Sequence, residues 1–288
     1  MNTDKKLWAN GKLIPCDSVI LNPRDRGFTL GDGIFETIRV REGEIIRIAQ
    51  HLARLRKGAE TIGLALLWTD AEIQQAIRET LVANQLKDAY LRLTLSRGVP
   101  TQRGLLPDEK NAKPSLIIQA ESFTGYPEGL YQRGMRAMTS SIRRNEHSPL
   151  ANIKSLNYLD NILARREAAK EGADEAVLLN TQGNIACASV TNIFFVKDKT
   201  LLTPPLSEGA LPGTVREYLI TKISPQHGFD IVERAIAPAE LVVMDEAFLT
   251  NALMGIMPLI SVDGKTFGRG RPGMITLALK KSRASEGL

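Results

Sequence analysis

Strand-like and helix-like stretches follow one another along this chain in an order that strongly limits its fold. A doubly wound parallel sheet needs strict alternation of strands and helices, and that alternation is missing here. The chain is therefore predicted to have an α+β (mixed α/β) fold. In chain order, the apolar periodicity predicts a hairpin over 7–15, two strands over 31–48, helices over 50–64 and 70–86, strands over 89–98, 114–122 and 135–144, a helix over 155–172, two strands over 173–196, a helix over 214–224, strands over 229–235, 246–252 and 257–264, and a final helix.

A break in this pattern indicates two domains. Residues 122–132 contain Gly125, Pro127 and Gly129 and no long periodic run, which is typical of a connection. The length of 288 residues is enough for two cores of common size. We predict a small N-terminal α/β domain over residues 1–121, a linker over 122–132 and a larger C-terminal domain over 133–288.

Charge and cysteine content exclude several classes of function. The net charge of +5 is spread along the chain with few aromatic residues, unlike the basic patches that bind nucleic acids. Two cysteines and three histidines without a cluster give no signal for a disulfide framework or a metal site. Neither a signal-peptide pattern nor an apolar run of about 18 residues is present, so we expect a cytoplasmic protein without a membrane partner.

Three local features can carry chemistry, although each also has a commoner structural explanation. Lys154 lies between a predicted strand and a predicted helix, beside Ile153 and Leu156. Most lysines are solvated, but a lysine in a partly desolvated pocket can form a Schiff base with an aldehyde. Gly213 precedes a predicted helix, whose first N–H groups can bind phosphate or only water. Arg54 lies on a predicted helix, where it can equally be a surface arginine.

Six segments, in order, give the chain a specific resemblance to one family. They are DRGFTLGDGIFETIRV, HLARL, IKSLNYL, TNIFFV, LPGTVR and LTNALMGIMP, which span most of the chain. With them the chain resembles the class IV aminotransferases, the fold-type-four pyridoxal-phosphate enzymes. The resemblance implies a D-amino-acid aminotransferase-like fold with pyridoxal 5'-phosphate between the two domains, mainly bound by the C-terminal one. It also implies a small-molecule substrate with amino and carboxylate groups, and a homodimer in which the loop over residues 98–113 lies near the neighbour's active site.

The resemblance also implies roles for the residues that match the family's motifs. Lys154 would be the Schiff-base lysine and the base that moves the substrate α-proton. Arg54 resembles the arginine that binds the phosphate, and a planar guanidinium suits a dianion. The remaining implied cofactor contacts are Thr214, Val215, Asn251 and Ala252 at the phosphate, Leu211 against one ring face, and Tyr158 at the phenolic oxygen of the ring.

The stretch IACASVTN, residues 185–192, contains a departure from the family pattern. Its small side chains would leave room for a flat ring, but Cys187 stands where the family has a glutamate, five positions before Asn192. That glutamate keeps the pyridine nitrogen protonated, whereas a thiol is a weak donor and is uncharged at pH 7. The substitution favours elimination over amino transfer. The alternative is that Cys187 only fills space and that another group supports the nitrogen.

The residues expected near the substrate favour one branch of the family. FETIRV and NALMGIMP resemble aminodeoxychorismate lyases, in which Thr37 and Asn251 match catalytic residues, while Phe35 replaces a tyrosine of the D-amino-acid enzymes. SRGVPTQRG resembles the arginine-bearing loop of the lyases, so Arg97 and Arg103 are candidates to bind a substrate carboxylate, with Arg103 the better match. D-amino-acid aminotransferases also have an arginine in this loop. The predicted reaction is elimination of pyruvate to give 4-aminobenzoate. The alternatives are a D-amino-acid or branched-chain amino-acid aminotransferase, and a cofactor-binding protein with low turnover.

Overall fold

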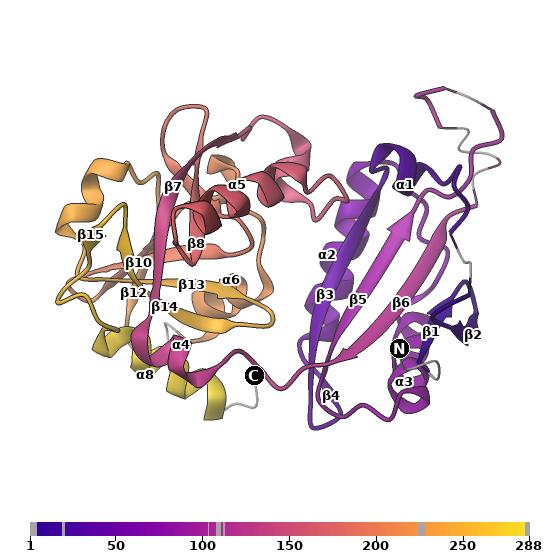
Figure 1. The fold of residues 1–288 in the computed structure, drawn as a ribbon, viewed down its shortest axis with the longest axis horizontal. Coiled ribbons are helices and arrows are strands. Elements are labelled where there is room, and N and C mark those ends of the chain that lie inside the picture. Colours follow the sequence, from indigo (N-terminus) through magenta and orange to yellow (C-terminus); the bar gives the residue numbers. More distant parts are fainter. Residues whose placement is uncertain are drawn as a thin grey trace. The chain divides into compact units, whose positions relative to one another are not determined.

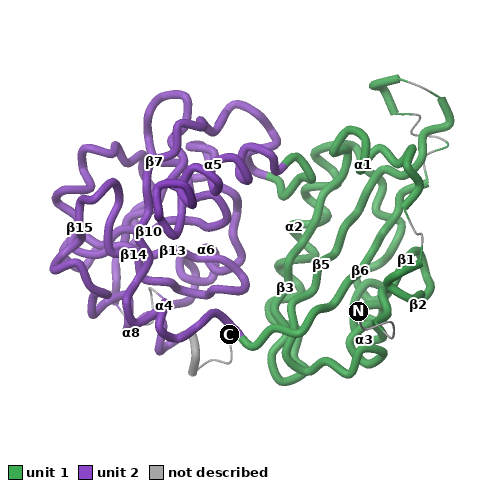
Figure 2. The backbone as a smooth tube through the Cα atoms, viewed as in Figure 1, with its two compact units in different colours: residues 1–124, 153–157 green, residues 125–152, 158–288 purple. Residues whose placement is uncertain are grey.

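The computed structural model describes residues 5–18, 21–102, 104–107, 111, 113–223 and 228–285. The chain forms two compact units (Figure 2). Unit 1 holds residues 1–124 and 153–157, and unit 2 holds residues 125–152 and 158–288. The first passage between the units falls within the predicted linker. The return of residues 153–157 to unit 1, which brings Lys154 with it, was not predicted from the sequence.

Unit 1 is a six-stranded antiparallel sheet in the order β2-β1-β6-β5-β3-β4, with helices on one face (Figure 1). Alternate side chains of the central strands, such as Ile34, Ile38, Leu91 and Leu93, form the core with two helices, as their period of two predicts. The intervening residues Phe35 and Thr37 of β3 and Arg92 of β5 lie on the opposite face. The elements are β1 (Lys6–Ala9), β2 (Lys12–Pro15), α1 (Arg26–Leu30), β3 (Gly33–Arg41), β4 (Glu44–Ile45), α2 (Ile48–Thr61), α3 (Asp70–Ala83), β5 (Ala89–Ser96) and β6 (Ser115–Ser122).

Residues 153–157 run along the outer edge of β3 in unit 1. The Phe35 N–H donates to the carbonyl of Lys154 at 2.8 Å, and the Leu156 N–H donates to that of Gly33 at 2.9 Å. These bonds keep the backbone extended, so the helix predicted from residue 155 begins only at Leu159. That boundary was wrong because pairing with a distant strand outweighed the local helical pattern.

Unit 2 is built on a nine-stranded mixed sheet in which β7 runs parallel to both β8 and β14. Side chains of β10 alternate between two cores: Ile193 and Phe195 enter one, and Phe194 and Val196 enter the other. The elements are α4 (Glu128–Arg133), β7 (Met135–Arg144), η1 (Pro149–Asn152), α5 (Leu159–Lys170), β8 (Glu175–Asn180), β9 (Ile185–Ala188), β10 (Asn192–Lys197), β11 (Thr200–Thr203), η2 (Leu206–Glu208), α6 (Thr214–Tyr218), η3 (Leu219–Ile223), β12 (Asp230–Glu233), η4 (Pro238–Val243), β13 (Glu246–Asn251), β14 (Gly255–Val262), β15 (Lys265–Thr266) and α8 (Met274–Ser285).

The mixture of helices and strands confirms the α+β prediction, with local differences in unit 2, where helix α4 and strand β15 were not predicted. Residues 173–196 form three strands, because a turn closed by the N–H of Ala188 and the carbonyl of Thr191 separates β9 from β10. Strand β11 was not predicted. No helix in the part of the chain that the structure describes is long and apolar enough to cross a membrane.

Candidate functional site

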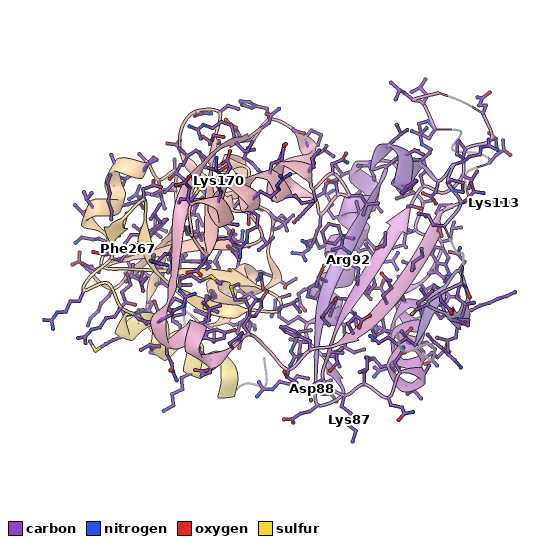
Figure 3. All side chains as sticks on the ribbon, in the orientation of Figure 1. Lys87, Asp88, Arg92, Lys113, Lys170 and Phe267 are labelled. Carbon is purple, nitrogen blue, oxygen red and sulfur yellow. The ribbon has the colours of Figure 1, made fainter. Side chains whose placement is uncertain are left out.

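Lys154 lies against an aromatic ring on unit 1. Its Nζ is 4.3 Å from the centroid of the buried Phe35 ring, and Cζ of Arg92 is 3.2 Å from the same centroid. Arg92, labelled on the sheet in Figure 3, pairs with Thr37 across β5 and β3, and its Nη1 lies 3.4 Å from Thr37 Oγ1. The structure thus gathers the predicted residues Lys154, Phe35 and Thr37, and adds Arg92.

Arg92 was not predicted from the sequence, although a signal for it exists. In YLRLT the apolar residues alternate with Tyr90, Arg92 and Thr94, so Arg92 had to lie on the face opposite the core. Which residues of β3 it would meet depends on strand register, which sequence alone did not provide. An amine and a guanidinium beside one ring can attack a carbonyl and bind a carboxylate.

Arg54 meets a buried carboxylate in a group we call the Glu36 cluster, which consists of Glu36, His51 and Arg54. Arg54 Nε donates to Glu36 Oε1 at 2.8 Å, and Arg54 Nη2 donates to Glu36 Oε2 at 2.7 Å. His51 Nδ1 lies 2.7 Å from Glu36 Oε2, and a carboxylate can only accept, so the imidazole donates. Arg54 is therefore an ordered, nearly buried side chain and not the surface arginine of the alternative explanation.

The electrostatics of the Glu36 cluster fix the charges of its members. Burial alone would raise the pKa of Glu36, but the Arg54 charge and hydrogen bonds from Arg54 and His51 lower it to about 2. Burial lowers the pKa of His51 more than Glu36 raises it, so the imidazole is neutral near pH 7. The cluster therefore holds one positive and one negative charge.

Arg97, predicted to bind a substrate carboxylate, is bound to other groups of unit 1, and its role at the substrate stays a prediction. Its Nε donates to Asp32 Oδ2 at 2.8 Å, and its Nη atoms donate to the carbonyls of residues 62 and 63, just beyond the end of α2. Arg26 Nε donates to the same Asp32 oxygen at 2.7 Å and also binds the carbonyls of residues 104 and 105. We call Arg26, Asp32 and Arg97 the Asp32 cluster. The other predicted arginine, Arg103, lies outside the described residues.

In unit 2, a side-chain amide shapes the loop that precedes α6. Asn192 Nδ2 donates to the carbonyl of Leu211 at 2.8 Å, and a Cβ atom at Gly213 would collide with Asn192 Oδ1. A larger residue at position 213 would therefore have to displace the Asn192 amide. Leu211 lies in this loop, and Thr214 and Val215 follow it at the start of α6, with Val215 in the core. Their contacts with the cofactor stay predictions.

The predicted catalytic residue Asn251 is engaged with the backbone. Its Oδ1 accepts the N–H groups of Leu253 and Met254 at 3.0 and 2.7 Å, and its Nδ2 donates to the carbonyl of Val190 at 3.3 Å. These bonds shape the turn that contains Ala252. The catalytic role of Asn251 and the phosphate contact of Ala252 stay predictions.

Cys187 lies in a tightly packed cluster of small residues. It pairs with Leu178 across β8 and β9, and both pack with Ala164 and Ala168 of α5. Burial raises the pKa of its thiol, so Cys187 is neutral at pH 7. The small side chains of β9 thus also serve close packing against α5, which supports the space-filling interpretation. Tyr158, predicted to contact the cofactor, is half-buried at the start of α5.

A metal site has no basis in these residues. No group of three His, Cys, Asp or Glu side chains that could hold a metal ion occurs within the described ranges. The acidic side chains of the Glu36 and Asp32 clusters are instead paired with arginines.

The sequence and the fold are similar to those of known enzymes. The profile of the amino-transferase class IV family matches residues 33–262. A provisionally named branched-chain-amino-acid aminotransferase of Methanocaldococcus jannaschii is 35% identical over 277 residues, covering 96% of this chain and 94% of that protein. The D-alanine aminotransferase of Bacillus licheniformis is 31% identical and covers 98% of both chains.

Solved structures give the same picture. The branched-chain amino acid aminotransferase of Escherichia coli superposes with a TM-score of 0.92 at 27% identity, covering 98% of this chain and 94% of that one. A provisionally named 4-amino-4-deoxychorismate lyase of Legionella pneumophila superposes with a TM-score of 0.85 at 27% identity, covering 94% and 97%.

Proposed function

This chain belongs to the class IV aminotransferase family, and we propose that it transfers the amino group of a branched-chain or related amino acid to a keto acid. The resemblance seen in the sequence is thereby confirmed, and with it the cofactor, pyridoxal 5'-phosphate. The main observation behind the proposal is that the amine of Lys154 and the guanidinium of Arg92 both lie next to the Phe35 ring.

The residues present fit such a cofactor. Arg54 offers an ordered guanidinium for the phosphate, and the loop fixed by Asn192 leads into the N–H groups of Thr214 and Val215. Lys154 offers an amine for the aldehyde. The departure is Cys187, which brings a neutral thiol where the family has a carboxylate.

Each residue of the proposed mechanism has a distinct task. When bound, the cofactor supplies an electron-withdrawing ring that makes the α-proton of the amino acid removable. Lys154 would hold the cofactor covalently, then take the α-proton on its amine and return it. Arg92 would bind the substrate carboxylate through its planar fork. Arg54 would bind the phosphate, aided by backbone N–H groups at the start of α6.

The relatives support amino transfer better than the elimination that the sequence motifs favoured. Both relatives described above carry aminotransferase names and cover nearly all of this chain. Of the two arginines expected at the substrate carboxylate, Arg97 has its donors directed to Asp32 and to backbone carbonyls. The branched-chain or D-amino-acid alternative therefore becomes our main proposal.

A donor and acceptor panel tests this proposal. The purified protein with pyridoxal phosphate is incubated with L-leucine, L-valine, D-alanine or aminodeoxychorismate, with and without 2-oxoglutarate. We expect keto-acid formation from a branched-chain donor only when the acceptor is present. Pyruvate release from aminodeoxychorismate without any acceptor would contradict amino transfer and favour the lyase.

The lyase remains the second candidate because of Cys187. Without a carboxylate at the pyridine nitrogen the ring is a weaker electron sink, and elimination tolerates this better than amino transfer does. The structural similarity to the Legionella protein supports the same candidate.

We also propose that the protein is a homodimer. Leu159 and Ile162 on α5 are 66% and 52% exposed, and Leu105 and Leu106 are 81% and 88% exposed. Within each pair the side chains are neighbours, on the helix or along the chain, and such exposed apolar neighbours are typical of protein interfaces. Light scattering should give twice the chain mass of 31.6 kDa, and Ile162→Glu should lower it to one chain mass. A wild-type monomer with full activity would remove the proposal, and Val82→Glu, at an exposed position on α3, serves as the control.

A further inference from the structure

A fully buried carboxylate lies behind Arg54, and the proposed mechanism gives it no task. We infer that Glu36, held in turn by His51, is a positioning residue that orients the Arg54 guanidinium toward the cofactor phosphate. This inference rests on the proposed phosphate-binding role of Arg54. The new point is that the Arg54 side chain is already oriented before the cofactor binds.

The contact geometry supports an orienting role. Glu36 accepts hydrogen bonds from Arg54 Nε at 2.8 Å and from Arg54 Nη2 at 2.7 Å. These two donors lie on the same side of the guanidinium. Two parallel bonds fix both the plane of a guanidinium and its rotation within that plane. Nη1 is consequently directed to the side opposite Glu36. A phosphate dianion needs such an ordered fork, and an ordered group loses less conformational entropy on binding.

The surroundings make this orientation costly to change. Glu36 is 1% exposed and lies on the same face of β3 as the core residues Ile34 and Ile38, two positions from each. His51 and Arg54 are three positions apart on α2, so both face the same strand. Leaving a buried carboxylate or guanidinium without its partner is strongly unfavourable. The arginine and the glutamate therefore keep each other in place even without a ligand.

His51 completes the arrangement as a neutral donor. Its Nδ1–H occupies Glu36 Oε2 from α2, while Arg54 approaches both carboxylate oxygens from the same helix. The carboxylate is thus fixed at three points. A fixed carboxylate can transmit its own orientation to the arginine, whereas a mobile one cannot.

Binding of pyridoxal phosphate and of pyridoxal, which lacks the phosphate, separates orientation from general stability. The readout is the ratio of the two dissociation constants, measured by absorbance titration without substrate. Arg54→Ala should reduce the preference for the phosphorylated form about ten- to a hundredfold, the value of a charge-assisted contact. Glu36→Asp keeps the charge but shortens the side chain, and we expect it to reduce the preference roughly tenfold.

Two controls sharpen this test. In an Arg54→Ala background, Glu36→Asp should leave the ratio unchanged, because the two residues act through one contact. His51→Asn, whose amide can replace Nδ1–H, should keep the preference, and His51→Leu should reduce it. If Glu36→Asp fails to fold, the comparison of His51→Asn with His51→Leu tests the orienting role of Glu36.

The outcomes distinguish this inference from the proposed function. An unchanged ratio in Arg54→Ala would overturn the phosphate-binding role of Arg54, and the inference with it. A reduced ratio in Arg54→Ala together with an unchanged ratio in both Glu36→Asp and His51→Leu would overturn the inference alone. Equal weakening of both ligands in Glu36→Asp would assign Glu36 a purely structural role.

Discussion

Replacing Lys154 with alanine is expected to abolish covalent attachment of the cofactor and to reduce turnover by about 10²–10⁴-fold, the usual contribution of a positioned acid–base group. The reason is that Lys154 is held by backbone bonds along β3, with its amine 4.3 Å from the Phe35 ring centroid. Borohydride reduction followed by peptide mass analysis measures the attachment.

A matched control for this variant is Lys170→Ala. Lys170 is an exposed lysine at the end of α5 (Figure 3), and its removal should leave attachment and turnover unchanged. If Lys154→Ala were still labelled at a single site, another lysine would hold the cofactor. The assignment of Lys154 would then be wrong.

Replacing Asp32 with alanine should lower the free energy of unfolding by about 3–5 kcal/mol, the typical cost of breaking a buried ion pair. Asp32 Oδ2 accepts from both Arg26 and Arg97, and both arginine side chains are less than 10% exposed, at 7% and 5%. Without the carboxylate, two guanidinium groups would lie close together in the interior. Urea unfolding of the two proteins measures the difference.

The effect of Asp32 should also depend on pH. Burial alone would raise the pKa of Asp32, but the bonds from Arg97 and Arg26 lower it below its ordinary value. A carboxyl group with a lowered folded-state pKa stabilises fully above its unfolded pKa and loses that contribution as pH falls through the folded value. The difference between wild type and Asp32→Ala should therefore shrink on acidification.

An exposed ion pair provides the comparison for Asp32. Glu60 pairs with Lys57 on the surface of α2, where both side chains are more than 70% exposed, at 71% and 74%. Glu60→Ala should leave the free energy of unfolding almost unchanged, because water and salt screen an exposed ion pair. If Asp32→Ala changed the free energy of unfolding as little as Glu60→Ala does, the Asp32 cluster would not stabilise the fold. Arg97 would then be available to bind substrate.

The sequence revealed most elements because their signals are local. The hairpin at Asn10-Gly11 and helix α3 follow from residues adjacent in the chain, and α3 begins with the capping box of Thr69 and Glu72. The start of α5 was wrong because residues 155–157 pair with β3, and no neighbouring residue signals that pairing.

The candidate site was predictable where a motif specifies a residue, but not where strand register decides. IKSLNYL pointed to Lys154, and HLARL pointed to Arg54. Choosing between Arg92 and Arg97 depended on which residues of β3 lie opposite β5. Arg92 and Arg97 are separated by an odd number of positions, and only Arg92 reaches the face that carries Phe35.

The return of residues 153–157 to unit 1 has a consequence for synthesis of the protein on the ribosome. The first 124 residues contain every strand of the unit 1 sheet. Strand β4 pairs only with the end of β3, so the edge of β3 around Ile34 stays uncovered until Ser155 has been made. An uncovered edge strand readily pairs with other chains, and nascent chains lengthen by only about 5–20 residues per second. A ribosome that stalls before residue 153 should therefore hold an aggregation-prone sheet, and a gene fragment ending at residue 124 should give an insoluble product.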